Sequence, residues 1–147
     1  MLFATGGGIK IQDEIKLVLA RKNNIQKKEK ATYYEDLEKQ FQEIKKKPTF
    51  EKSWQGHTYK WWASHLPIRV VDDLKNIKAP IYFVHGTKDE SVPVESADLA
   101  FKILQKEGKL DIYYVRLKGV GHSMRGQRID IFGNAFKWLD QNQDLYA

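Results

Sequence analysis

The sequence lacks cysteine altogether among its 147 residues. This absence excludes disulfide bonds, thiolate metal sites and a cysteine nucleophile, and it suits the reducing cytoplasm, where we expect the protein to be located. The sequence also lacks any run near the roughly 20 apolar residues that a membrane-spanning helix needs. Its start, residues 1–9, has neither the basic region nor the long apolar region of a signal peptide. We therefore predict a soluble protein without a membrane span.

Charge is present in both signs but is unevenly distributed. Twenty-five Lys and Arg against nineteen Asp and Glu give a net charge of +6, and the excess lies mostly within residues 1–50. We interpret it as a solvated, lysine-rich helical region. The lysines are not interleaved with the aromatic and Arg side chains that stack on bases, so we expect no nucleic-acid partner. The hypothesis of a nucleic-acid-binding protein is supported by the net charge alone, and it is the least favoured.

The chain begins with the pattern of a strand. Met1–Thr5 is mostly apolar, and Gly6–Gly8 then allow a sharp turn of the backbone. A terminal strand needs a neighbour on at least one side, so we expect that part of the sheet lies upstream. The edge left open would pair with another copy of the chain, which predicts a homo-oligomer built around this strand.

Helices and an aromatic segment follow. Apolar positions from Ile11 predict one helix, and a capping-box pattern at Thr32 and Glu35 predicts the start of a second that ends before Pro48. The next segment is rich in aromatic side chains, which either cover an apolar pocket or, as is commoner, pack irregular structure onto a core. It contains Trp54, Tyr59, Trp61 and Trp62. His57 and His65 have no partner at metal-ligand spacing, and we expect neither a metal nor a cofactor.

The second half alternates strands with helices. Ile81–Val84 is an apolar run after a proline, as in a strand buried on both faces, and residues 111–117 form the next strand. Between them a helix starts after Pro93 and stops at Gly108. A last helix, residues 128–142, carries an apolar stripe on one side, made of Ile129, Phe132, Phe136 and Leu139. This order predicts a right-handed βαβ unit and a parallel sheet, hence an α/β fold.

Two side chains with acid and base chemistry follow the two strands. Asp89 lies in the loop after the first strand, and His122 lies in a glycine-flanked loop after the second. Parallel strands lie about 4.8 Å apart and end at the same edge of a sheet, so these side chains can meet. Asp89 would then accept a hydrogen bond from the His122 ring and orient it as a general base. The alternative is that Asp89 only stabilises its turn and that His122 is incidental.

Residues 81–93, which read IYFVHGTKDESVP, resemble the acid-bearing stretch of α/β-hydrolases, particularly the esterase, lipase and prolyl-oligopeptidase-like groups. Residues 119–123, GVGHS, look like the histidine loop of that family. The resemblance implies that Asp89 and His122 are the catalytic acid and base. It also implies a partial α/β-hydrolase fold of about three parallel strands flanked by helices. Residues 1–9 and 75–147 would form the core and residues 10–74 a helical lid.

The family's serine lies in a G-x-S-x-G turn, and this motif is absent from the sequence. Ser91, Ser96 and Ser123 lack that context. The resemblance therefore implies the C-terminal part of a serine hydrolase for ester or peptide substrates. It would supply the acid and the histidine and would be inactive as this chain alone. The alternative hypothesis is a non-catalytic binding or interaction module on a degenerate hydrolase scaffold.

Overall fold

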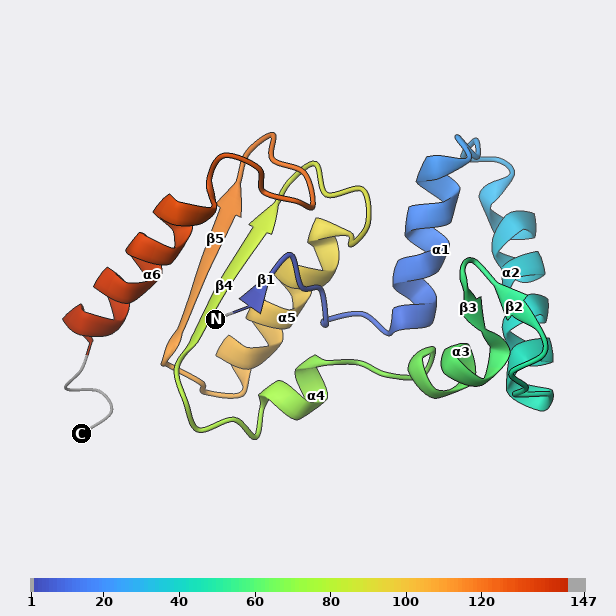
Figure 1. Cartoon of the computed structure of the whole chain (residues 1–147), viewed down its shortest axis with the longest axis horizontal. Helices are drawn as coiled ribbons and strands as arrows, with labels where there is room; N and C mark the ends of the chain where they lie inside the picture. Colours follow the sequence, from blue (N-terminus) through green and yellow to red (C-terminus); the bar gives the residue numbers. More distant parts are fainter. Residues whose placement is uncertain (1, 143–147) are drawn as a thin grey trace. The chain divides into compact units, whose positions relative to one another are not determined.

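The computed structural model describes residues 2–142 (Figure 1). The chain divides into two compact units: a sheet unit, Met1–Gly8 with Val70–Ala147, and a helical unit, Ile9–Arg69. The helical unit ends earlier than the expected 10–74 insertion, because Val71 and Leu74 belong to the core of the sheet unit. That the helical unit acts as a lid stays a prediction. No helix in the described part of the chain combines the length and the apolar character needed to cross a bilayer.

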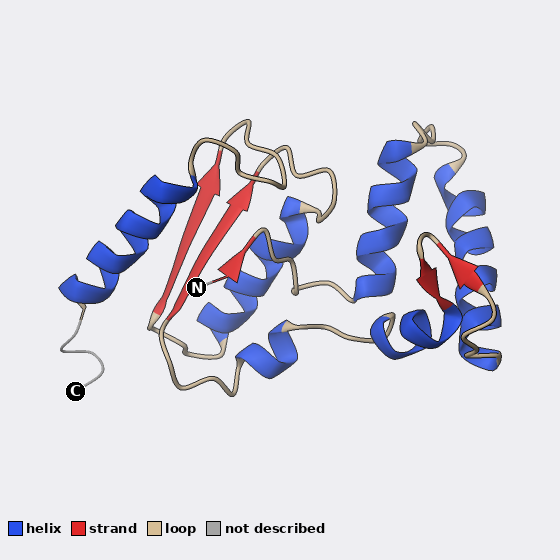
Figure 2. Cartoon of the chain, viewed as in Figure 1, coloured by secondary structure: helices blue, strands red, loops and turns tan. Residues whose placement is uncertain are grey.

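Within residues 2–142, the sheet unit is built on three parallel strands in the order β1, β4, β5 (Figure 2). These strands are β1 (Leu2–Phe3), β4 (Ile81–Gly86) and β5 (Ile112–Leu117). All six residues of β4 are buried, as its apolar sequence predicts for a central strand. β1 is an edge strand among the described residues, and it pairs with β4 only.

Helices cover both faces of this sheet. They are α4 (Val71–Leu74), α5 (Val94–Lys106) and α6 (Arg128–Gln141). Ile81 and Phe83 of β4 pack into one cluster with residues of α4 and α5, whereas Tyr82 and Val84 pack into another with residues of α6. Successive strand residues point to opposite faces, so the alternation follows from strand geometry. The predicted α/β class is thereby confirmed.

The turn after β1 lies directly against α5. The Gly7 amide donates to the Ser96 hydroxyl (2.8 Å), and the Gly8 amide donates to the Ser96 carbonyl (3.0 Å). A Cβ atom added at Gly8 would lie 2.3 Å from the Ala100 amide nitrogen, so only glycine allows this approach. The glycines expected to turn the chain therefore also bring its backbone onto a helix.

The apolar stripe of α6 faces outward. We name the α6 stripe by its four residues, which remain substantially exposed: Ile129 87%, Phe132 44%, Phe136 62% and Leu139 36%. The side of α6 that packs on the sheet presents Ile131 and Ala135 instead. The sequence correctly groups the stripe on one side of the helix, but that side is not the one buried within this unit.

The helical unit consists of three helices and a short antiparallel hairpin. Its elements are α1 (Ile11–Lys22), α2 (Lys30–Lys46), β2 (Ser53–Trp54), β3 (His57–Thr58) and α3 (Tyr59–His65). The capping-box prediction at Thr32 is wrong, because α2 already begins at Lys30 and Thr32 lies inside the helix. A threonine cap occurs instead at α3, where Thr58 accepts a hydrogen bond from the Trp61 amide (3.2 Å).

Aromatic side chains form the core of the helical unit. Phe41 of α2 is fully buried and meets the ring of Trp54 edge to face, with centroids 5.7 Å apart. Trp54 in turn meets Trp62 of α3 at 5.3 Å, and the Trp62 indole nitrogen donates to the Trp54 carbonyl (2.6 Å). The hairpin and two helices therefore share one apolar cluster, in accordance with the core interpretation of the aromatic segment.

We predict that Phe41→Ala lowers the free energy of unfolding of the helical unit by about 3–5 kcal/mol, because it removes a fully buried ring and leaves a cavity. Urea titration followed by tryptophan fluorescence measures the change. Phe50→Ala is the matched control, since Phe50 is 76% exposed and its removal should change stability by no more than about 0.5 kcal/mol. Equal losses in the two variants would contradict the assigned core.

Candidate active site

The candidate site lies where β4 and β5 end. The two strands pair in parallel along their full length, from Ile81 opposite Ile112 to Gly86 opposite Leu117. Their carboxyl ends therefore stop at the same level, and the loops that follow emerge at one edge of the sheet. Asp89 lies in the first loop and His122 in the second.

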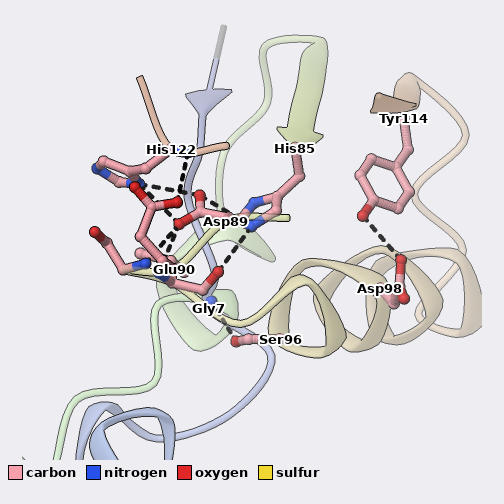
Figure 3. Close-up of polar contacts among 10 residues, drawn as sticks. Gly7, His85, Asp89, Glu90, Ser96, Asp98, Tyr114 and His122 are labelled. Carbon is pink, nitrogen blue, oxygen red and sulfur yellow. Dashed lines mark hydrogen bonds and ion pairs between the residues drawn. The ribbon is translucent and has the colours of Figure 1, made fainter. Parts of the chain in front are cut away.

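The structure brings Asp89 and His122 into direct contact (Figure 3). The Nδ1 atom of His122 lies 3.1 Å from Oδ1 and 3.0 Å from Oδ2 of Asp89, although 33 positions separate the residues. A carboxylate only accepts hydrogen bonds, so Nδ1 of His122 carries a proton. The Asp89 side chain is fully buried and that of His122 is 43% exposed. A buried carboxylate thus orients a partly exposed imidazole.

Asp89 also organises its own loop. Its Oδ1 accepts hydrogen bonds from the amides of Ser91 (2.9 Å) and Val92 (2.8 Å). Such contacts between an aspartate and the amides that follow it stabilise a turn. The two interpretations of Asp89 are therefore compatible, since one carboxylate holds the turn and contacts the imidazole.

Gly86 allows the two loops to approach each other. A Cβ atom at this position would lie 2.2 Å from the Val120 carbonyl oxygen, well inside any real contact. That same oxygen accepts a hydrogen bond from the Lys88 amide (2.9 Å), and the Gly119 amide donates to the Thr87 hydroxyl (2.9 Å). Backbone contacts thus join the aspartate loop to the histidine loop next to the candidate site.

Glu90 adds a second carboxylate beside the imidazole. Its Oε2 accepts a long hydrogen bond from the backbone amide of His122 (3.4 Å). Glu90 is solvent-exposed, unlike Asp89, so this contact is screened by water. It helps to hold the histidine loop but does not contact the ring nitrogen that Asp89 binds.

Sequence analysis assigned no role to one residue of the site, His85. His85, on β4, is 1% exposed, and its Nε2 lies 3.1 Å from the Val92 carbonyl oxygen and 3.4 Å from Oδ2 of Asp89. The carboxylate therefore lies between two imidazoles (Figure 3). The available signal was a histidine inside an otherwise apolar strand, where an ionisable side chain is uncommon.

A small hollow opens beside His122. It has a volume of about 230 Å³ and is lined by His122, Ser123, Met124, Arg128 and Phe132. A larger hollow of about 970 Å³ lies at the opposite edge of the sheet, next to Pro80 and Asp111. Because those two residues precede β4 and β5, the larger hollow is remote from Asp89. The smaller one is the space that borders the candidate base.

Other polar groups near these elements have separate roles. Ser96 is fully buried and bonded to the turn after β1. On β5 the Tyr114 hydroxyl donates to Asp98 of α5 (2.8 Å), and burial, followed by the bond to Asp98, raises the pKa of Tyr114. Among residues 2–142 no group of three or more His, Asp or Glu side chains is placed to hold a metal ion.

A parallel sheet with helices on both faces, carrying a hydrogen-bonded carboxylate and imidazole at its carboxyl edge, is consistent with the α/β class of serine hydrolases. Comparison with known families leads to the same class. The sequence model of the prolyl oligopeptidase family matches residues 28–145, and the chain belongs to this family. The match confirms the resemblance to prolyl-oligopeptidase-like α/β-hydrolases. No curated protein and no solved structure gives a significant match.

We predict that Gly86→Ala destabilises the sheet unit by about 1–3 kcal/mol and lengthens the contact between Asp89 and His122, because the new methyl group displaces the Val120 carbonyl. Chemical denaturation measures the first effect, and the ring resonances of His122 report the second. The matched control is Gly133→Ala on α6, where a Cβ meets nothing within 4 Å. That change should stabilise the helix by roughly 0.5–1 kcal/mol. A Gly86→Ala protein as stable as wild type would contradict the assigned contact.

Proposed function

We propose that Asp89 and His122 are the acid and the base of a Ser-His-Asp triad that hydrolyses ester or peptide bonds. The single observation that carries the proposal is the hydrogen bond between the buried Asp89 carboxylate and Nδ1 of the half-exposed His122. Membership of the prolyl oligopeptidase family supports it independently. The helical unit would cover the site as a lid.

In this mechanism His122 Nε2 takes the proton of a serine hydroxyl while the serine oxygen attacks the substrate carbonyl carbon. The resulting imidazolium returns the proton to the leaving alcohol or amine as the bond to the carbonyl carbon breaks. A water molecule then gives a proton to His122 Nε2 and attacks the acyl-enzyme. The carboxylic acid product leaves, and the serine takes the proton back. Asp89 stays ionised throughout, and it holds the ring in the required tautomer and stabilises the imidazolium.

The sequence carries no G-x-S-x-G motif for such a serine. We therefore propose that the nucleophile and the oxyanion-hole donors come from outside these 147 residues. In a triad, loss of the serine costs about a million-fold in kcat, so the chain alone should be inactive. The proposed triad chemistry acts on an ester or a peptide bond.

We predict that the 147-residue chain neither turns over p-nitrophenyl acetate nor reacts with a fluorophosphonate probe. Turnover that disappears in His122→Ala would contradict its inactivity. A longer chain translated in frame from upstream DNA that encodes G-x-S-x-G should be labelled on that serine. Asp89→Asn should then lower its kcat about 10⁴-fold, because the amide forces the wrong tautomer on His122. Unchanged activity of Asp89→Asn would refute the triad assignment.

A second candidate function is a non-catalytic binding module, and the exposed α6 stripe favours it. Its partner would be apolar, since two of the four stripe residues are more than 60% exposed. The upstream DNA separates the two functions. An in-frame G-x-S-x-G supports the hydrolase, whereas a promoter and a ribosome-binding site directly before the Met1 codon support the binding module.

We further propose that the chain forms a homo-oligomer through the open edge of β1, with light scattering expected to give a multiple of 17.2 kDa. Phe3→Pro is the test variant. The Ala4 amide bonds to β4, so the amide of Phe3 points to the open edge, and proline removes it without breaking that bond. We expect a monomer. A wild-type monomer would contradict the proposal, and Phe50→Ala controls for nonspecific apolar association.

A further inference from the structure

Among the described residues of the candidate site, Asp89 is the only carboxylate whose side chain is completely buried. Its two oxygens have different partners. Oδ1 accepts from two backbone amides, those of Ser91 and Val92. The His122 ring lies near both oxygens, at 3.1 Å from Oδ1 and 3.0 Å from Oδ2, whereas His85 lies near Oδ2, at 3.4 Å. The backbone therefore fixes one oxygen, and only ring nitrogens are seen to fix the other.

The protonation state of His85 follows from its partners. Nε2 faces the Val92 carbonyl and the Asp89 carboxylate, both of which can only accept, so this nitrogen carries a proton. Nδ1 is buried without a hydrogen-bond partner. A proton on Nδ1 would be a buried, unpaired donor on a cationic ring, which is costly. We therefore expect His85 to be the neutral tautomer with its hydrogen on Nε2.

We infer that His85 is a positioning residue for the catalytic acid. Its Nε2 atom forms a hydrogen bond with the Val92 carbonyl oxygen (3.1 Å) and lies 3.4 Å from Oδ2 of Asp89, so it is close to both ends of the aspartate loop. It thus holds the Val92 end of the loop and, together with His122, limits rotation of the Asp89 carboxylate about the Cβ–Cγ bond. The neutral ring adds no positive charge beside Asp89, so the carboxylate remains fully available to His122. This inference rests on the proposed function, because it assigns His85 a role through Asp89.

The test uses the full chain labelled with ¹⁵N in its four histidines, whose ring-nitrogen resonances report the tautomer of each. In the wild-type protein at pH 7 we expect the Nδ1–H tautomer at His122 and the neutral Nε2–H tautomer at His85. The expected tautomer of His85 is thus tested in the wild-type protein alone. A His85 ring that is an imidazolium at pH 7, or that carries its hydrogen on Nδ1, would overturn the inference.

His85→Phe keeps a buried ring but removes the donor. We expect His122 to lose its preference for the Nδ1–H tautomer, with resonances that average over both tautomers, while the circular dichroism spectrum is unchanged. His85→Gln, whose amide can donate to the same oxygens, should restore the wild-type resonances of His122. His65→Phe is the control, since it removes an imidazole of the helical unit and should leave His122 as it is. A folded His85→Phe protein with unchanged His122 resonances would refute the inference, as would failure of His85→Gln to restore them.

Asp89→Asn separates this inference from the proposed function. The amide oxygen would keep the Ser91 and Val92 amides, and its NH₂ group would face Nδ1 of His122. We expect His122 to change to the Nε2–H tautomer. If it does not change, the proposed pairing of acid and base is refuted. If it changes while His85→Phe has no effect, only the role of His85 is refuted.

Discussion

The candidate site depends on the close approach of two backbone segments, the end of β4 at Gly86 and the histidine loop at Val120. Parallel pairing of β4 with β5 brings the strand ends to one level, but it does not by itself join the loops that follow. Their junction needs a residue without a side chain, because a Cβ would overlap the Val120 carbonyl oxygen. That oxygen then becomes an acceptor for the Lys88 amide. The meeting of Asp89 and His122 is therefore built on backbone contacts and only completed by side chains.

Burial of Asp89 imposes the next constraint. An ionised carboxylate without partners is expensive to remove from water, and hydrogen bonds to the charged form offset that cost. Two amides of its own loop and the ring of His122 supply these bonds, and His85 lies close to the second oxygen. Two of these donors, the amides of Ser91 and Val92, belong to the aspartate loop itself, so the loop conformation and the buried carboxylate stabilise each other. Glu90 is exposed, so water solvates its carboxylate and no comparable set of hydrogen-bond donors is needed.

Local sequence patterns predicted those parts of the fold that local chemistry determines. β4 follows from a continuous apolar run, and α5 from a proline before it and a glycine after it. The contact of Asp89 with His122 was predictable because parallel strands end at one edge of a sheet. The buried face of α6 was not predictable, because the α6 stripe and the side with Ile131 both have helical spacing. Spacing does not identify which face is covered. The proximity of His85 to Asp89 was missed, because it depends on a loop conformation that residue types alone do not determine.

The α6 stripe and the candidate site share one residue, Phe132, which lies on the exposed side of α6 and also lines the hollow beside His122. Any surface that covers the stripe therefore also narrows the space next to the proposed base. Exclusion of water from that space would strengthen the interaction between Asp89 and the His122 imidazolium, because charges attract more strongly at low dielectric constant. Phe132 therefore connects the stripe with the hollow beside His122. A surface that buries Phe132 would bring the acid and base closer to the environment in which triad chemistry is effective.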